Sequence, residues 1–250
     1  MRPSFKLLLP PVISIFLLAS HVYAGPPFLT DDPEPVPYQN YEAYIFSTLD
    51  RSAGNTFIQA PAFEFNLGVA TNLQLHLVVP LAYSSSSAAH STYGFGDMEL
   101  GAKFRFVEES EHIPQIAIFP LLELPTGNAS RGLGNGETWG KLPLWLQKSW
   151  GPWTTYGGGG YALNQAAGQR NYPFAGWLWQ RDLGEHLTLG GEMFAQGKST
   201  DDGHAYALLN FGGTYKLTAH CQLLFTGGHT VAGERHWIGY LGLYWTWGKN

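Results

Sequence analysis

The stretch FGDMELGAKFRF, Phe95–Phe106, decides the fold, because from Gly96 onward small or apolar residues occupy every second position. The residues between them include four charged ones: Asp97, Glu99, Lys103 and Arg105. Successive side chains of a β-strand point to opposite faces of the sheet, so this alternation predicts a strand with one apolar face and one charged face. The whole sheet must therefore meet an apolar medium on one side and pair or hydrate charge on the other.

Segments with similar alternation follow one another to the C-terminus, and no segment has a convincing helical period. We predict twelve strands: Tyr41–Thr48, Thr56–Val69, Leu73–Leu81, Phe95–Phe106, Gln115–Leu124, Trp139–Lys148, Trp153–Leu163, Phe174–Gln180, Leu187–Gln196, Ala205–Leu217, Cys221–Gly228 and Trp237–Trp247. The number is even, as in bacterial outer-membrane barrels made of one chain.

The predicted connections alternate in length along the chain. Those after even-numbered strands are short: Ala70–Asn72, Ser149–Pro152, Arg181–His186, Thr218–His220 and the somewhat longer Val107–Pro114. Those after odd-numbered strands are mostly longer and rich in Gly, Ser and Asn, as in Ala82–Phe95, Pro125–Thr138 and Gly197–His204. An antiparallel meander would place all the short turns at one end, which matches the short periplasmic turns and longer extracellular loops of outer-membrane barrels.

A secreted β-sandwich would show the same periodicity, with polar residues facing solvent. Three features favour the barrel: the length of the strands, the aromatic residues at strand ends and the C-terminal sequence. Many strands have about ten residues, which suits a tilted membrane span, whereas strands of soluble domains average about five or six. Aromatic residues that would form a membrane-interface girdle are Phe104, Phe106, Trp150, Trp153, Trp245 and Trp247.

The C-terminal residues Gly242–Trp247 resemble the recognition signal of outer-membrane barrels, although Gly248–Asn250 follow the last aromatic residue. The resemblance implies that the barrel-assembly machinery is a partner and binds the C-terminal strand. We therefore expect an all-β, transmembrane, antiparallel up-and-down barrel in the outer membrane of a Gram-negative bacterium, in contact with its lipid.

The composition agrees with this class. Of 250 residues, 13% are charged and 31 are Gly, whereas soluble domains carry about 25% charged residues. The mean hydropathy of −0.11 excludes a helical membrane protein, whose spans would be long apolar blocks. Cys221 is the only cysteine, which excludes an intrachain disulfide.

Residues 1–24 have the features of a secretory signal peptide. Arg2 and Lys6 precede the apolar block Leu7–Ala19, and Val22–Ala24 is a small-x-small cleavage site. An uncleaved anchor is the alternative. Loss of the two bases takes the formal charge from −5 to −7, which argues against nucleic acid as a partner.

Residues 25–40 are rich in Pro and acids and show no period, so we predict an extended arm before a barrel of residues 41–250. The arm is a candidate plug of the lumen. In that hypothesis Asp31 and Asp32 would meet Lys103, Arg105 or Lys141.

With the apolar register facing lipid, a set of titratable side chains points into the barrel. The predicted lumen-lining or binding candidates are Glu64, His76, Asp97, Glu99, Lys103, Arg105, Glu123, Lys141, Glu192 and Lys216. A Lys or Arg on the lipid face costs about 2–4 kcal/mol at the bilayer midplane, so the register is strongly specified. Two interpretations stay open: the charges pair to fill a narrow barrel, or some of them line a conduit or binding site.

Other motifs carry no clear chemistry, and we predict no catalytic residue, metal site or cofactor. The Gly-rich segment Arg131–Lys141 lacks the spacing of a phosphate-binding loop, and the nine histidines lack metal-ligand spacing. Gly157–Gly160 would either bend the strand sharply, which we favour, or leave space in the lumen.

Four segments resemble one bacterial outer-membrane family, the meta-pathway of phenol degradation family, whose members are described as transporters. They are Gly25–Glu42 (GPPFLTDDPEPVPYQNYE), Gly96–Phe106 (GDMELGAKFRF), Phe119–Asn128 (FPLLELPTGN) and Leu142–Tyr161 (LPLWLQKSWGPWTTYGGGGY). The resemblance implies an outer-membrane barrel that transports small aromatic or hydrophobic molecules. We therefore expect a porin-like channel for passive uptake of such a solute, through the lumen or a lateral opening. The alternative is a closed barrel with a lipid-modifying enzymatic role or a structural one.

Overall fold

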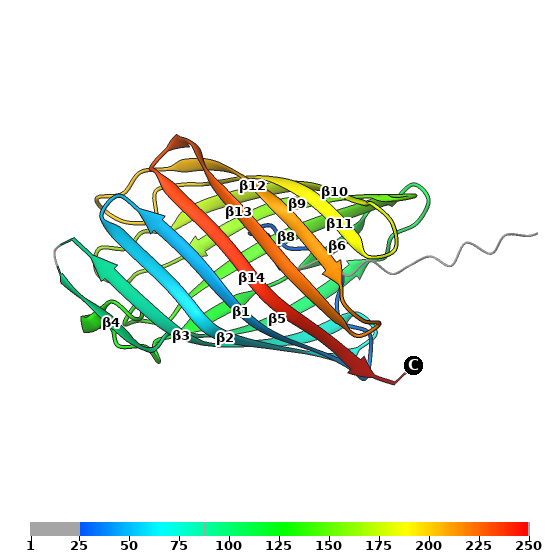
Figure 1. Cartoon of the computed structure of the whole chain (residues 1–250), viewed down its shortest axis with the longest axis horizontal. Helices are drawn as coiled ribbons and strands as arrows, with labels where there is room; N and C mark the ends of the chain where they lie inside the picture. The colour runs from blue at the N-terminus through cyan, green and yellow to red at the C-terminus, as the bar shows by residue number, and fades with distance from the viewer. Residues whose placement is uncertain (1–25, 88, 250) are drawn as a thin grey trace, which may run out of the picture.

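The computed structural model describes residues 26–87 and 89–249, and almost all of them belong to one antiparallel sheet that closes on itself (Figure 1). Its strands are β1 (Asn40–Ser52), β2 (Asn55–Ala70), β3 (Leu73–Ser86), β4 (Ala89–Phe95), β5 (Met98–Val107), β6 (Gln115–Ile118), β7 (Leu121–Leu124), β8 (Trp139–Trp150), β9 (Trp153–Leu163), β10 (Tyr172–Asp182), β11 (Leu187–Gln196), β12 (Tyr206–Lys216), β13 (Cys221–Gly233) and β14 (His236–Gly248). One short 3-10 helix, η1 (Ala129–Arg131), lies in the loop after β7. The predicted signal peptide lies outside the described residues.

These fourteen segments occupy twelve strand positions around the barrel, which we call staves. Both β4 and β5 pair with β3, so they form one stave interrupted at Gly96 and Asp97. In the same way β6 and β7 both lie between β5 and β8, interrupted at Phe119 and Pro120. Proline has no N–H to donate to a ladder, which accounts for the second break. The antiparallel pairing of β1 with β14 closes the barrel, and the predicted twelve-stranded antiparallel barrel is confirmed.

The segment Ala82–Phe95 is not the long loop that its polar sequence predicted. It forms the end of β3 and the whole of β4, which pair as a hairpin. The strands β1 and β13 also run several residues beyond their predicted C-terminal ends. Beyond the membrane both faces of a hairpin can be hydrated, so backbone pairing continues there without any apolar alternation.

The longer loops still gather at that end of the barrel. The connections 125–138, 164–171 and 197–205 lie there, whereas 71–72, 151–152, 183–186 and 217–220 are the turns at the opposite end. Figure 1 shows the C-terminus at this second end, which is the periplasmic one in the outer-membrane topology.

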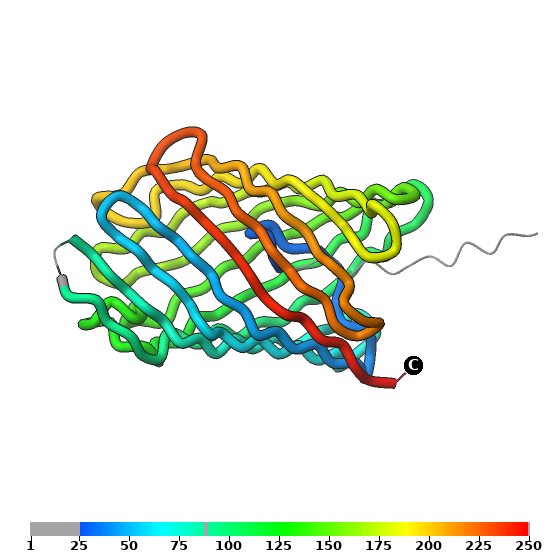
Figure 2. The backbone as a smooth tube through the Cα atoms, viewed as in Figure 1, coloured from blue at the N-terminus to red at the C-terminus, as the bar shows by residue number. Residues whose placement is uncertain are grey.

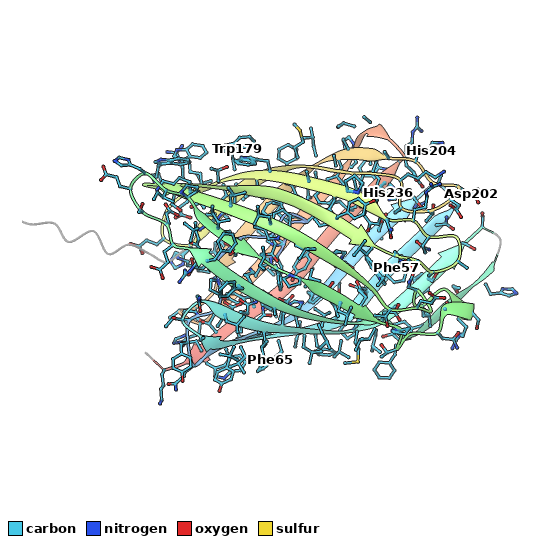
Figure 3. The ribbon with its side chains drawn as sticks, turned by 180° about the vertical axis from the view of Figure 1, so that it is seen from behind. Phe57, Phe65, Trp179, Asp202, His204 and His236 are labelled. Atoms are coloured by element: carbon cyan, nitrogen blue, oxygen red, sulfur yellow. The ribbon has the colours of Figure 1, made fainter. Side chains whose placement is uncertain are left out.

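The outer face of the barrel is a belt of exposed apolar side chains. It includes Ile45, Phe63, Phe65, Leu75, Leu144, Trp177, Trp179, Met193, Phe211 and Leu241, and Figure 3 shows Phe65 and Trp179 on the outside of the ribbon. So much contiguous apolar surface marks contact with lipid. Among the described residues there is no helix with the length and hydropathy to cross a bilayer.

Residues 26–39 lie inside the barrel, where the blue segment crosses the lumen in Figure 2. Thr30, Asp32 and Val36 of this arm are buried. The arm enters beside Gly68 of β2, where any Cβ would overlap the carbonyl oxygens of Val36 and Pro37. The backbone of this segment thus takes up space that side chains fill in other narrow barrels.

Candidate functional site in the lumen

Lys103, from the stretch that decides the fold, is the centre of the contact between the barrel and the arm. Its Nζ lies 3.0 Å from Asp31 Oδ1 and 3.6 Å from Asp32 Oδ2, and the side chain is only 4% exposed. The same Nζ lies 5.0 Å from the centre of the Phe119 ring. Burial raises the pKa of Asp32, and the Lys103 ammonium opposes that rise. The ammonium therefore offsets part of the cost of burying the Asp32 carboxylate.

The other two bases predicted to meet Asp31 and Asp32 have different partners. Arg105 Nη1 donates to Glu34 Oε1 at 2.8 Å, and Nη2 donates to the carbonyl of Thr71 at 3.3 Å. Lys141 Nζ lies 3.8 Å from Glu99 Oε2, on the barrel wall. Glu34 was not among the predicted residues, although it lies in the arm two positions after Asp32.

A second polar cluster surrounds His76 on β3. Its Nδ1 lies 2.7 Å from Asn66 Oδ1 and 3.5 Å from Glu64 Oε1, and its Nε2 lies 3.1 Å from Glu99 Oε1. Beside it, the hydroxyls of Tyr44 and Tyr244 donate to the buried Glu42. These groups come from neighbouring strands and satisfy one another across the wall, which is the behaviour of a filled polar core.

Glu192 lies across the lumen on β11 and holds the tip of the arm. Its carboxylate accepts hydrogen bonds from the backbone N–H groups of Leu29 and Thr30 and from Asn210 Nδ2. Gly176 on β10 leaves room for the Thr30 hydroxyl, because a Cβ at this position would collide with it. The arm is thus fixed on both sides of the lumen.

Asp97 binds a loop. Its two oxygens accept the N–H groups of Gly127 and Asn135, at 2.8 and 2.5 Å. Between these residues Leu133 is only 1% exposed, since it packs against Gly94 inside the extracellular mouth. Asp97 therefore folds loop 125–138 over the mouth.

The two remaining candidates lie apart from the arm. Glu123 on β7 is opposite Glu99 in the register of the wall. Lys216 is half-buried at the periplasmic end of β12. The structure thus divides the ten predicted lumen residues among the arm contacts, the wall clusters, the loop and the mouth.

A cavity of about 190 Å³ lies in the lumen above the arm. Leu29 and Asp31 form its floor, and Tyr172, Gln196 and Tyr206 lie at its upper rim. Its sides are mainly aromatic, with Phe119, Trp145, Phe174 and Phe194, and Lys141 adds one charged group. The ring centres of Trp145 and Phe194 lie 6.2 and 6.3 Å from that of Phe174.

Trp145 is 3% exposed, and its indole Nε1 is buried without a hydrogen-bond partner among the described residues. The ring itself lines the cavity, whereas Lys141 and Gln196 are among the polar side chains that line it. The cavity thus combines aromatic sides with a few polar groups.

The aromatic residues of this cavity were missed because they break the alternation used to assign the lumen. In Leu142–Leu146 and Phe174–Trp179 both faces of the strand are largely apolar, which indicates an apolar patch inside the barrel as well as outside. The four glycines of β9 belong to the same region. Pairing with β8 and β10 continues through them without a shift of register. The Trp145 ring packs inside the wall at Gly158 and the Trp177 ring outside it at Gly157.

Within residues 26–87 and 89–249, no group of three or more His, Cys, Asp or Glu side chains could hold a metal ion. The lumen thus contains a cavity above an ion-paired arm.

Known proteins share this architecture. The family model described as "Putative MetA-pathway of phenol degradation" matches residues 47–246. The chain is similar to an outer membrane channel from Pseudomonas putida F1, with a TM-score of 0.72 at 16% identity, covering 86% of this chain and 98% of that one. It is also similar to the KdgM porin, with a TM-score of 0.56 at 12% identity, covering 81% and 98% of the two chains.

A third similar structure is the translocator domain of the autotransporter NalP from Neisseria meningitidis, with a TM-score of 0.56 at 11% identity, covering 82% and 88% of the two chains. At these identities the similarities show the fold. No curated protein gives a significant match to the sequence.

Proposed function

The chain belongs to the phenol-degradation family whose model matches it, and from this premise and the geometry of the lumen we propose that it is a channel for passive uptake of a small aromatic or otherwise hydrophobic solute. The protein is an outer-membrane β-barrel of twelve staves with an apolar belt. Similarity to a solved outer membrane channel and a porin favours transport over catalysis, so we assign it no reaction.

The cavity above the arm is the observation that carries this proposal. At about 190 Å³ it exceeds the roughly 150 Å³ of an engineered apolar cavity that binds benzene. Its aromatic sides suit a ring, and aromatic pairs contribute about 0.5–1.5 kcal/mol beyond the area they bury. Gln196 and the Lys141 ammonium, which line the cavity, are the groups that would bind a hydroxyl or carboxylate of the solute.

We propose that the arm acts as the plug below this cavity and must shift for a solute to reach the periplasm. Its contacts with Lys103, Arg105 and Glu192 support this role, because they hold it across the lumen. In this organisation residues 1–24 are a cleaved export signal, residues 25–40 the plug and residues 41–250 the barrel.

Liposome swelling with the purified barrel tests the uptake proposal. Phenol-sized aromatic solutes should enter faster than sugars of similar mass, and filling the cavity by Leu121→Trp, at a residue that lines it, should abolish that preference. A Leu144→Phe variant, changed on the lipid face, is the matched control. Equal entry of sugars and aromatics in the wild-type protein would remove the proposed selectivity, and lipid hydrolysis without permeation would favour the enzymatic alternative.

The C-terminal strand supports a proposal about assembly. β14 ends in Gly242–Trp247 and pairs along its whole length with β1, so we propose that the barrel-assembly machinery recognises it before closure. Replacing Trp245 and Trp247 by Ser should lower the amount of folded protein in outer membranes. Wild-type amounts would contradict the proposal.

A further inference from the structure

A groove of about 580 Å³ opens on the outer face of the barrel, across β9–β13. Trp179, Phe211 and Phe225 form its walls, and Trp153 and Arg181 lie at one end of it. Figure 3 shows Trp179 on the outside of the ribbon. This groove faces the membrane and is separate from the luminal cavity.

Gly191 creates the trough. It pairs with Trp179 on β10 and with Phe211 on β12, and both aromatic side chains are largely exposed, at 56% and 63%. The Phe211 ring leans toward this glycine, 3.0 Å from where a Cβ would lie, so the channel is the space between that ring and Trp179. An acyl chain is the flexible apolar ligand that fits such a channel in a bilayer.

The groove lies in the periplasmic half of the membrane. Trp153 is the first residue of β9 and Arg181 is the last but one of β10. At the far end, Phe211 is five residues from the end of β12 at Lys216. Five residues at about 3.3 Å make roughly 16 Å along the strand, or about 12 Å of depth at a tilt of about 45°. The groove therefore stays within one leaflet of a bilayer core of about 30 Å.

Arg181 is an outward-facing cation at the headgroup end of this groove. It is exposed, and its guanidinium lies 5.1 Å from the centre of the Trp153 ring. No carboxylate in the described part of the chain lies within 4.0 Å of it. The neighbouring Asp182 instead accepts a hydrogen bond from the Thr188 hydroxyl at 2.6 Å. A guanidinium fixed on an indole presents its free donors to a phosphate, which it can bind through two parallel hydrogen bonds.

We propose that this groove is a binding site for an anionic phospholipid of the periplasmic leaflet, with the phosphate on Arg181 and one acyl chain over Gly191. Charge complementarity selects the headgroup, since no carboxylate of the described residues pairs with this cation. The shape selects the chain, since the trough runs from the interface toward the middle of the bilayer. A lipid in this position would cover apolar surface that sits directly behind the inner anchor of the arm at Glu192.

Native mass spectrometry of the intact barrel, with phosphatidylglycerol and phosphatidylcholine of identical acyl chains, tests the site. We expect wild type to retain phosphatidylglycerol about fivefold more, which corresponds to about 1 kcal/mol for one cation near the membrane surface. Arg181→Ala should reduce this ratio to about one, and Arg181→Lys should keep part of it because the charge remains.

A groove-filling variant and a matched control complete the test. Gly191→Leu should lower retention of both lipids, because the added side chain occupies the trough beside the exposed Phe211 ring. Phe63→Ala, on the lipid face of β2, should change neither. Equal retention of the two lipids by wild type, or an unchanged ratio in Arg181→Ala, would overturn the site. So would a dimer that Gly191→Leu dissociates, since a second copy would then occupy the groove.

Discussion

The lumen has two walls of opposite chemistry. On β1–β5 the inward side chains toward the periplasmic end are mostly charged or strongly polar, and they bind the arm or one another, as Lys103 and His76 do. Further along these strands Phe46, Ala62 and Val78 pack together. On β8–β11 many inward side chains are aromatic, and with Phe119 they surround the cavity. The charges hold the arm in place, whereas the aromatic wall surrounds the cavity that we propose for the solute. The sequence pattern had suggested the charged residues as the binding candidates.

Among the variants of the charged wall, one that removes the ammonium of Lys103 should have the largest effect on how firmly the arm is held. In Lys103→Ala, the buried Asp32 and the partly exposed Asp31 would lose their cation, and removing one partner of a buried pair costs about 3–5 kcal/mol. We expect release of the arm, seen as higher single-channel conductance and faster proteolysis within residues 26–39. Lys216→Ala, at the periplasmic mouth, is the control and should behave as wild type. A Lys103→Ala channel with wild-type conductance would mean that the arm is not held by this pair.

A substitution in the aromatic wall should change the affinity for the solute and leave the arm in place. Phe174→Ala removes the central ring of the aromatic set and should weaken binding of phenol about tenfold, by analogy with the energy of aromatic pairs. Titration calorimetry in detergent would measure this loss. Leu144→Ala, on the outer face of β8, should leave the affinity unchanged. If Phe174→Ala binds phenol as wild type does, the cavity is not the solute site.

A substitution of Glu34 should weaken the contact between the charged wall and the arm by a smaller amount. Glu34→Gln keeps the shape of the side chain but removes the charge that pairs with Arg105 at 2.8 Å. The pair is partly exposed, so we expect a loss of about 1 kcal/mol and a roughly fivefold increase in arm proteolysis. Phenol affinity should not change. An effect as large as that of Lys103→Ala would show that the two ion pairs act as one unit.

Asp97 should give the smallest effect, because it holds a loop rather than the arm. Asp97→Asn keeps one acceptor oxygen and loses the other, so about 1 kcal/mol of loop stability should disappear. The amides of Gly127 and Asn135 should exchange with solvent faster, while those of the arm keep their protection. Exchange that is unchanged at both amides would mean that other contacts fix the loop.

Most of the fold could be predicted from the alternation of side chains. All twelve staves were predicted, including the one that carries Phe95–Phe106, because lipid on one side imposes a strict two-residue period. The hairpin within Ala82–Phe95 was missed, since water surrounds both of its faces and no period is required there. The two breaks, at Gly96 and Phe119, were also not predicted.

The site was predicted only in part. Pairing of Asp31 and Asp32 with a base was a specific hypothesis, and the structure places both beside Lys103. The choice among Lys103, Arg105 and Lys141 depends on the path of the arm, which alternation does not determine. The cavity was missed for a different reason: when both faces of a strand are apolar, as around Trp145, the period that separates lumen from lipid is lost.

The place where the arm enters has a consequence for the order of assembly. Gln39 donates to the carbonyl of Gly68 beside the periplasmic turns, so the arm reaches the lumen without any part of it crossing the bilayer. The seam between β1 and β14 can therefore close first, and the arm can dock afterwards, like a ligand covalently attached to its receptor. A barrel that begins at residue 40 should accordingly fold, and a synthetic peptide of residues 26–39 added from the periplasmic side should restore its low conductance.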